Sequence, residues 1–301
     1  MNWKFDNSII IQGIAEPQIF KYASQMETCG IKIVAGASSG YGITSTEAIP
    51  VFDLVEEAIQ EIGEIKTSVI FALPNRVLDV ATEAIASGIE QLVIVTPDVT
   101  PLDTIELFKR AKANKTLVLG PGSSGIMIPE KYSLGILQPQ YFARGNVGII
   151  GYTQTPIYEV AWALNKAQIG QSIAISLGEN KIANSGVVQW LKMLDEDDST
   201  KVIVLIQLAR DINYKALEFI TEAIGKPVIC YIVGSQTPTE KVFRNSIDIL
   251  NNHLSNSIPA INSYPQIVTT IEKIGAMVAN KPSDIPRLIE GILAQKKQKR
   301  A

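Results

Sequence analysis

Four turns that contain glycine or serine follow apolar runs in the first half of the chain and offer polar groups to a ligand. They are QGIAEPQIF at 12–20, GASSGYG at 36–42, VTPDVTPLD at 95–103 and LGPGSSG at 119–125. Glycine lets a backbone approach a ligand closely, and a helix that begins after such a turn presents free amides to a phosphate. The turns therefore predict a nucleotide-like ligand, although none has the GxGxxG spacing of dinucleotide-binding proteins.

Residue types in these turns predict individual structural or ligand-binding roles. Gly13 suits a tight turn, and Pro17 suits the first position of a helix. Tyr41 offers an aromatic face to an adenine, while Thr96 and Asp98 are polar contacts or helix caps. Two structural alternatives stay open: Gly13 only turns the chain, and the second turn is a flexible connector.

The residue types that most often carry catalysis are scarce. His253 is the single histidine, and Cys29 and Cys230 are far apart without a CxxC spacing. This pattern predicts neither a zinc-type metal site nor a disulfide framework. His253 lies in NNHLSNS, a polar stretch typical of a helix end or loop, so we expect a surface residue rather than a general base.

The overall charge and hydrophobicity restrict the partners. With 27 Lys and Arg against 30 Asp and Glu, the formal net charge is -3, which disfavours nucleic acid. Hydrophobic residues make up 46% and charged residues 19%, which predicts a large core or a partner interface. The longest apolar runs, such as 202–206 and 228–233, fall far short of the roughly 18 residues that span a bilayer. We expect no membrane span, no secretory signal and a cytoplasmic location.

Strand-like runs alternate with longer amphipathic stretches, as in βαβ units of parallel sheets. The predicted strands form two series, at 8–13, 31–36, 68–73, 91–96 and 116–121, and then at 146–151, 171–178, 201–209 and 226–234. Between strands, the stretch 78–88 has helical periodicity and ends at Gly88. The sequence therefore predicts an α/β fold with two doubly wound domains.

The segment 123–145 separates the two series and is rich in Gly, Pro and polar residues. It lacks a long periodic pattern, which predicts an ordered connector. We place the domain boundary near residue 143, giving domains 1–143 and 144–301.

In their order and spacing, the motifs QGIAEPQ, VAGASSGYGITSTEAIPVF, VTPDVTPLD, LGPGSSGIMIPE, LGILQP, NVGII, TPIYE and GKPVICYIVGSQTP resemble the α-subunit of succinyl-CoA synthetase over nearly the whole chain. The resemblance implies an N-terminal Rossmann-like CoA-binding domain and a C-terminal flavodoxin-like domain. It also implies CoA or acyl-CoA as ligand and an ATP-grasp β-like subunit as partner. No metal is expected, because the chain has one histidine and two separate cysteines. A homo-oligomer is the alternative partner, and neither nucleic acid nor a membrane is expected.

Carried over residue by residue, the resemblance implies CoA contacts in the first domain at Gly13, Ala15, Gln18, Tyr41 and Thr96. In the first loop only Gln18 keeps the family's residue type. Tyr41 stands where the family has a lysine that reaches CoA, which removes a charge that would pair with phosphate. We therefore expect CoA to bind more weakly or differently.

A second group of residues is expected near the substrate or phosphate. The family's Gly-Pro-Asn-Cys-Pro-Gly turn becomes 120–125, and its helix-opening Ser-Gly-Thr becomes 153–155. The implied residues in and beyond these turns are Gly122, Ser123, Thr153, Thr155 and Tyr158.

The reaction centre departs furthest from the family. Asn245 stands where the family has its phosphate-carrying histidine, Leu208 falls near the supporting glutamate, and Gln154 replaces a glycine. An amide nitrogen is not a phosphoryl acceptor, because its lone pair is delocalised. We therefore assign no catalytic residue and expect Leu208 to be buried.

The leading hypothesis is a CoA-binding regulatory or scaffolding subunit without a phosphohistidine route. The alternative is an acyl-CoA ligase or acyl-transfer subunit whose partner supplies the missing groups, so whether the chain is an enzyme stays open. A dinucleotide-binding oxidoreductase is a third hypothesis, which lacks a GxGxxG motif.

Overall fold

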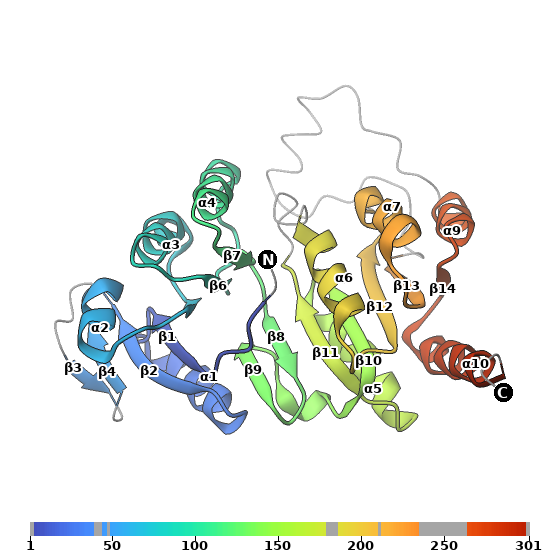
Figure 1. Ribbon diagram of the computed structural model, residues 1–301, viewed down its shortest axis with the longest axis horizontal. Helices are drawn as coiled ribbons and strands as arrows, with labels where there is room; N and C mark the ends of the chain where they lie inside the picture. The colour runs from blue at the N-terminus through green and yellow to red at the C-terminus, as the bar shows by residue number, and fades with distance from the viewer. Residues whose placement is uncertain are drawn as a thin grey trace.

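The computed structural model describes residues 3–38, 44–46, 49–178, 186–209, 212–234 and 264–298. They form two seven-stranded sheets side by side, each flanked by helices (Figure 1). All the strands predicted from the sequence are present, and the α/β class with two doubly wound domains is confirmed. No helix within these ranges is both long and apolar enough to cross a membrane.

The first sheet, sheet A, has the strand order β3-β4-β2-β1-β5-β6-β7. Its strands are β1 (Ser8–Gln12), β2 (Lys32–Ala37), β3 (Thr44–Thr46), β4 (Ile49–Phe52), β5 (Thr67–Ile70), β6 (Gln91–Ile94) and β7 (Leu117–Leu119). Neighbouring strands pair parallel, except that β3 pairs antiparallel with β4. The parallel strands follow the Rossmann order, which changes direction between β1 and β5.

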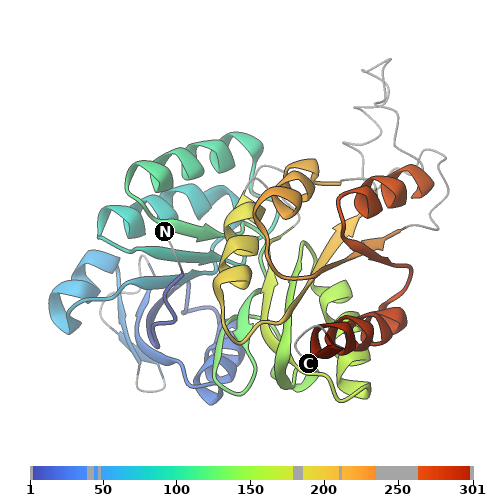
Figure 2. The same cartoon turned by 45° about the vertical axis from the view of Figure 1, so that its right-hand side comes forward.

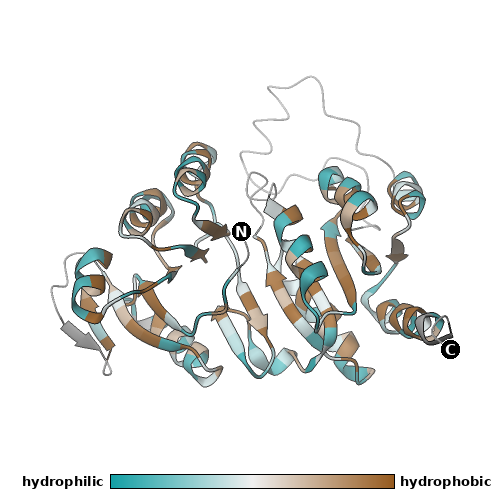
Figure 3. Cartoon of the chain, viewed as in Figure 1, coloured by the Kyte–Doolittle hydropathy of each residue, from teal (hydrophilic) through white to brown (hydrophobic). Residues whose placement is uncertain are grey.

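Helices cover both faces of sheet A, namely α1 (Pro17–Thr28), α2 (Val55–Ile62), α3 (Val77–Ala86) and α4 (Pro101–Ala113). On β1, Ile9 and Ile11 join one core cluster and Ile10 joins the other, so consecutive residues are buried on opposite faces. This arrangement explains the continuous apolar run at 8–11. Figure 3 shows strong hydrophobic colour along the central strands and mixed colour on the helices.

Helix starts agree with the sequence in one case and differ in another. Helix α1 begins at Pro17, as predicted. Helix α4 is capped by Thr100, whose hydroxyl accepts a hydrogen bond from the Asp103 amide at 3.2 Å. The capping role considered for Thr96 and Asp98 is therefore wrong, because the chain makes further turns before the helix starts.

The second sheet, sheet B, has the order β14-β13-β12-β10-β11-β8-β9. Its strands are β8 (Gly125–Ile128), β9 (Tyr132–Gly135), β10 (Arg144–Gly151), β11 (Gln171–Ser176), β12 (Val202–Leu208), β13 (Val228–Val233) and β14 (Met277–Ala279). Strands β10 to β14 are parallel in flavodoxin-like order. The helices are α5 (Gln154–Lys166), α6 (Val187–Glu196), α7 (Tyr214–Ala223), α9 (Tyr264–Lys273) and α10 (Ile285–Gln298).

The segment 123–145 differs from expectation, because it contains the β8–β9 hairpin rather than only a connector. Strand β8 pairs antiparallel with β11 and adds the hairpin to sheet B. A side chain at Gly125 would place its Cβ 1.8 Å from the Leu134 carbonyl oxygen, so this pairing requires glycine. The hairpin precedes the boundary proposed near residue 143, and that boundary stays a prediction.

The two sheets share a hydrophobic core. One cluster of buried residues includes Met26 of α1, Tyr132 of β9, Ile175 of β11 and Leu191 of α6. Trp3 contacts Trp190 of α6 with ring centroids 5.4 Å apart, which ties the N-terminal segment to the second sheet. Figure 2 shows the two sheets meeting around the β8–β9 hairpin. The core therefore fixes the carboxyl edges of both sheets relative to each other.

Candidate functional site

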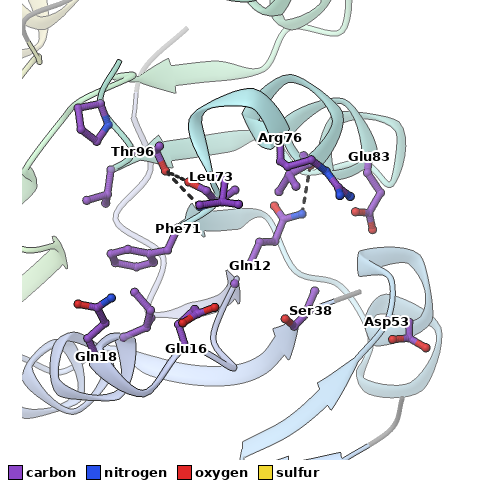
Figure 4. Close-up of a pocket in the computed structure, with 17 residues that line it drawn as sticks. Gln12, Glu16, Gln18, Ser38, Asp53, Phe71, Leu73, Arg76, Glu83 and Thr96 are labelled. Carbon is purple, nitrogen blue, oxygen red and sulfur yellow. Dashed lines mark hydrogen bonds between the residues drawn. The ribbon is translucent and has the colours of Figure 1, made fainter. Parts of the chain in front are cut away.

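A pocket of about 530 Å³ lies at the carboxyl edge of sheet A, where the strand order changes direction between β1 and β5 (Figure 4). Open α/β sheets commonly bind ligands at this position. The pocket is formed by the ends of parallel strands, the start of α1 and one face of α3. Its lining residues are Gln12, Gly13, Glu16, Gln18, Ile19, Ala37, Ser38, Asp53, Phe71, Ala72, Leu73, Arg76, Val80, Glu83, Val95, Thr96 and Pro97.

Two polar side chains in the pocket wall are held by the protein itself. The Gln12 amide accepts a hydrogen bond from the Ser68 hydroxyl at 2.8 Å and donates one to the Val80 carbonyl at 3.1 Å. The Thr96 hydroxyl donates to the Ala72 carbonyl at 2.7 Å and accepts from the Ala72 amide at 3.1 Å. These contacts join neighbouring strand ends and fix the two side chains in the pocket wall.

The turn after β1 depends on Gly13. This residue has φ of 91°, and a Cβ would lie 1.8 Å from the Phe71 carbonyl oxygen. The turn therefore packs directly on the segment after β5, and the predicted tight turn is confirmed. Helix α1 starts at Pro17, directly after this turn. No side chain caps the first amides of the helix. Those amides lie beside the pocket, because Gln18 lines it.

Charged groups gather at the end of the pocket formed by β4, α2 and α3. The Glu83 carboxylate accepts a hydrogen bond from the Val55 amide at 2.6 Å, and burial raises the pKa of its carboxyl group. Asp53 follows β4 at the same end, whereas Glu16 lies at the start of α1, away from Asp53 and Glu83 (Figure 4). Arg76 is the one Lys or Arg among the described lining residues. This end of the pocket therefore offers a single cation among acidic groups.

The structure brings together three of the five residues predicted to contact CoA. Gly13, Gln18 and Thr96 all line the pocket. Ala15 lies half-buried in the same turn but outside the lining, and Tyr41 lies outside the described residues. Their contact with a ligand stays a prediction.

Gly122 and Ser123 lie in the connection between the two sheets. The Gly122 amide donates to the Thr96 carbonyl at 2.8 Å. The Ser123 hydroxyl donates to the Ser176 carbonyl of β11 at 2.5 Å and accepts from the Gly125 amide at 2.8 Å. Both residues are thus near one end of the pocket, and their polar groups are bound within the chain.

Thr153, Thr155 and Tyr158 lie around the start of α5 in sheet B. The Thr153 side chain forms no cap, and Thr155 is exposed. The Tyr158 hydroxyl accepts hydrogen bonds from the Gln138 amide at 3.0 Å and from the Gln154 side-chain amide, and burial raises its pKa. None of the three threonine and tyrosine residues lines the pocket of sheet A.

Of the three residues that stand at the family's reaction centre, the structure describes Leu208 and Gln154. Leu208 is the last residue of β12 and is half-buried, so the expectation of a buried leucine is wrong. The reason is its position at the carboxyl end of the strand, where the cover of the sheet ends. Asn245 and His253 lie outside the described residues. The Gln154 amide turns back to Tyr158 and to the Ile136 carbonyl at 3.4 Å.

The two cysteines differ in how deeply they are buried. Cys230 is fully buried in β13, and burial raises the pKa of its thiol to about 12, while burial also raises the pKa of Cys29. Within the described ranges, no three His, Cys, Asp or Glu side chains are grouped as metal ligands.

Sequence analysis missed Gln12, Asp53, Arg76 and Glu83 of the pocket. The strand predicted at 68–73 is three residues too long, and this placed Phe71, Ala72 and Leu73 inside the sheet rather than in the pocket wall. Strand β5 ends at Ile70, so the residues after it belong to the ligand-facing edge.

Comparisons with known proteins agree with this architecture. The chain matches the CoA binding domain family over residues 5–98. It is 32% identical over 286 residues to the alpha subunit 2 of an ADP-forming succinate–CoA ligase from Archaeoglobus fulgidus, covering 95% of this chain and 96% of that relative. The corresponding alpha subunit of Staphylococcus aureus is 27% identical over 281 residues, covering 93% and 90%.

Two solved structures share the fold. ATP citrate lyase from Methanothrix soehngenii, in complex with citrate and coenzyme A, matches with a TM-score of 0.79 and 14% identity over 98% of this chain. The dinucleotide-forming acetyl-coenzyme A synthetase 1 of Ca. Korarchaeum cryptofilum matches with a TM-score of 0.68 and 17% identity over 93% of this chain. This chain spans 51% of the first chain and 59% of the second.

Both of these alpha subunits match over at least 90% of this chain and of their own length. On this identity and coverage, the chain belongs to the family of succinate–CoA ligase alpha subunits.

Proposed function

We propose that this protein binds CoA or acyl-CoA in the pocket of sheet A and acts as a regulatory or scaffolding subunit. The observation that carries the proposal is the pocket itself. It lies where the strand order of sheet A changes direction, and within the segment that matches the CoA binding domain family. All lining residues fall between Gln12 and Pro97, inside the matched range 5–98.

The shape of the pocket favours one orientation of CoA. The pyrophosphate fits over Gly13 at the start of α1, where no side chain caps the helix and the helix dipole attracts negative charge. The adenosine end then lies toward Asp53 and Arg76. The pantetheine arm passes Thr96 toward Gly122, which is hydrogen-bonded to Thr96 and leads to sheet B.

The proposed loss of phosphoryl transfer rests on the second sheet. Asn245 supplies no imidazole, and the apolar Leu208 supplies no carboxylate to orient one. Gln154 fills the helix opening with a side chain that is hydrogen-bonded to Tyr158. A subunit with these residues retains a ligand pocket without a phosphoryl acceptor, which favours action through binding.

The family membership favours a second candidate, an acyl-CoA ligase or acyl-transfer subunit completed by a partner. The relatives are alpha subunits of succinate–CoA ligases, and we propose an ATP-grasp β-like subunit as partner, with a homo-oligomer as the alternative. A cytoplasmic location stays a prediction. Copurification from native cells, followed by assay of the isolated complex with ATP, CoA and succinate, separates the candidates. Turnover of succinyl-CoA would contradict the scaffolding role.

Ligand binding itself is tested by thermal unfolding of the full chain with CoA, acyl-CoA, a nicotinamide dinucleotide or ATP. A ligand that binds only the folded state raises the melting temperature. We expect CoA or acyl-CoA to give the largest increase. A larger increase with the nicotinamide dinucleotide would instead support an oxidoreductase, and no increase with either CoA or acyl-CoA would overturn the proposal.

A further inference from the structure

The short turn between β5 and α3 presents an apolar side chain and a cation to the same pocket. Leu73 lines the pocket and yet is 70% exposed. Arg76 precedes α3, is exposed, and its side chain forms no ion pair or hydrogen bond within the part of the chain that the structure describes. In Figure 4 the Arg76 side chain extends toward the end of the pocket that holds Glu83.

The charge balance at that end makes Arg76 distinctive. Glu83 and Asp53 place carboxyl groups there, which disfavour a phosphate. Glu83 accepts a hydrogen bond from the Val55 amide, and burial raises its pKa, which reduces its negative charge. Because acidic side chains still surround this end, a phosphate there requires a cation. The described lining residues supply one, Arg76.

The side of the pocket formed by the described ends of β2 and β4 provides no substitute. Its lining residues are Ala37, Ser38 and Asp53, none of which is a cation. A guanidinium binds phosphate with two parallel hydrogen bonds, and such charge-assisted bonds are stronger than neutral ones. Arg76 is thus the group best suited to a phosphate on the ribose.

We propose that the turn formed by Leu73 and Arg76 recognises the adenosine end of the ligand and selects for a 3′-phosphate. Leu73 packs against the adenine, which covers an apolar side chain that is otherwise in water. The Arg76 guanidinium pairs with the ribose phosphate. This inference rests on the proposed CoA binding and deepens it, because it names the part of the ligand that this turn distinguishes.

The test compares CoA with 3′-dephospho-CoA by isothermal titration calorimetry. For the parent protein we expect CoA to bind about 10-fold or more tightly, as a charge-assisted phosphate contact implies. Arg76→Gln is expected to weaken CoA until the two affinities agree within about 2-fold, with dephospho-CoA unchanged. Arg76→Lys is expected to retain part of the preference, because it keeps the charge but loses the planar fork.

Two further variants separate a ligand contact from a general effect. Arg110→Gln removes an arginine on α4 that pairs with Glu106 outside the pocket, and it should leave the preference intact. Leu73→Ser should weaken CoA and dephospho-CoA by the same factor, since both carry adenine. Unchanged melting temperatures check that the variants are folded.

The outcomes distinguish this inference from the proposed function. If CoA binds but the preference is absent in the parent, or persists in Arg76→Gln, the role of Arg76 is overturned while CoA binding stands. If neither ligand binds the parent protein, CoA binding and the role of Arg76 both fall.

Discussion

The carboxyl edges of the two sheets use their polar residues differently. At sheet A, Gln12 and Thr96 are fixed in the wall of an open pocket, and no side chain caps the start of α1. At sheet B, Tyr158 and Gln154 bond to each other, and Ser123 bonds to β11. Among the described residues, the first edge surrounds an open pocket, whereas these polar groups at the second edge are hydrogen-bonded within the chain.

The largest expected contrast is in covalent chemistry at sheet B. Incubation with labelled ATP and a β-like partner should leave no acid-labile phosphate on this chain, because Asn245 lacks a nucleophilic nitrogen. Asn245→His alone should not restore labelling, since Leu208 still provides no carboxylate and Gln154 still fills the helix opening. Peptide mapping that finds acid-labile phosphate on His253 of the parent would contradict this prediction and reveal a replacement acceptor.

The next effect is on the pocket of sheet A. Gly13→Val should abolish measurable CoA binding and lower the free energy of unfolding by about 3 kcal/mol or more, because a branched side chain at positive φ clashes with the Phe71 carbonyl. Calorimetry and urea unfolding measure the two effects.

Gly88→Ala is a matched control for the backbone strain. Gly88 also has positive φ, at 89°, but a Cβ there meets no atom within 4 Å. This variant should lose about 1–2 kcal/mol of stability from the strained backbone alone and keep its affinity for CoA. Equal CoA affinity in Gly13→Val and the parent would exclude a ligand at this turn.

These contrasts also show what the sequence could and could not predict. The strands at 8–12 and 202–208 are buried on both faces, so their continuous apolar runs identified them. The hairpin at 125–135 escaped notice because its strands are four residues each and depend on Gly125 and Gly135 facing one another. Short strands of this kind have too few residues for a periodic pattern.

The candidate site was predictable where backbone conformation dictates the residue, as at Gly13. It was not predictable where a side chain enters the pocket from a distant element. Asp53 follows β4 and Glu83 lies on α3, and their sequence neighbourhoods resemble ordinary solvated helix or loop segments. Only the folded arrangement brings these carboxyl groups to the same end of the pocket as Arg76.

A smaller effect is expected at the second edge. Tyr158→Phe keeps the ring contacts with Tyr141 and Phe142 but removes the hydroxyl that accepts from the Gln138 amide and from Gln154. Loss of these bonds in a half-buried site should lower the free energy of unfolding by about 1–2 kcal/mol, with CoA affinity unchanged within about 2-fold. Urea unfolding and calorimetry provide the measurements. Unaltered stability with much weaker CoA binding would show that Tyr158 contacts the ligand rather than stabilising the fold. The two edges would then differ less than described above.

The smallest effect concerns the acidic end of the pocket and depends on pH. Because burial raises the pKa of Glu83 in the folded chain, its contribution to stability is fully present below its unfolded pKa and is lost as the pH rises through the folded pKa. Glu83→Gln removes this titration and keeps an oxygen that accepts from the Val55 amide. The variant should therefore gain stability relative to the parent as the pH rises above the ordinary range of a glutamate carboxyl group, by less than about 1 kcal/mol because the carboxyl group is partly solvated. Urea unfolding across this range, with Glu61→Gln on the exposed face of α2 as control, measures the change.

A relative stability that falls as the pH rises would show that Glu83 is stabilised in its ionised form, and the end of the pocket facing Arg76 would then carry a permanent negative charge.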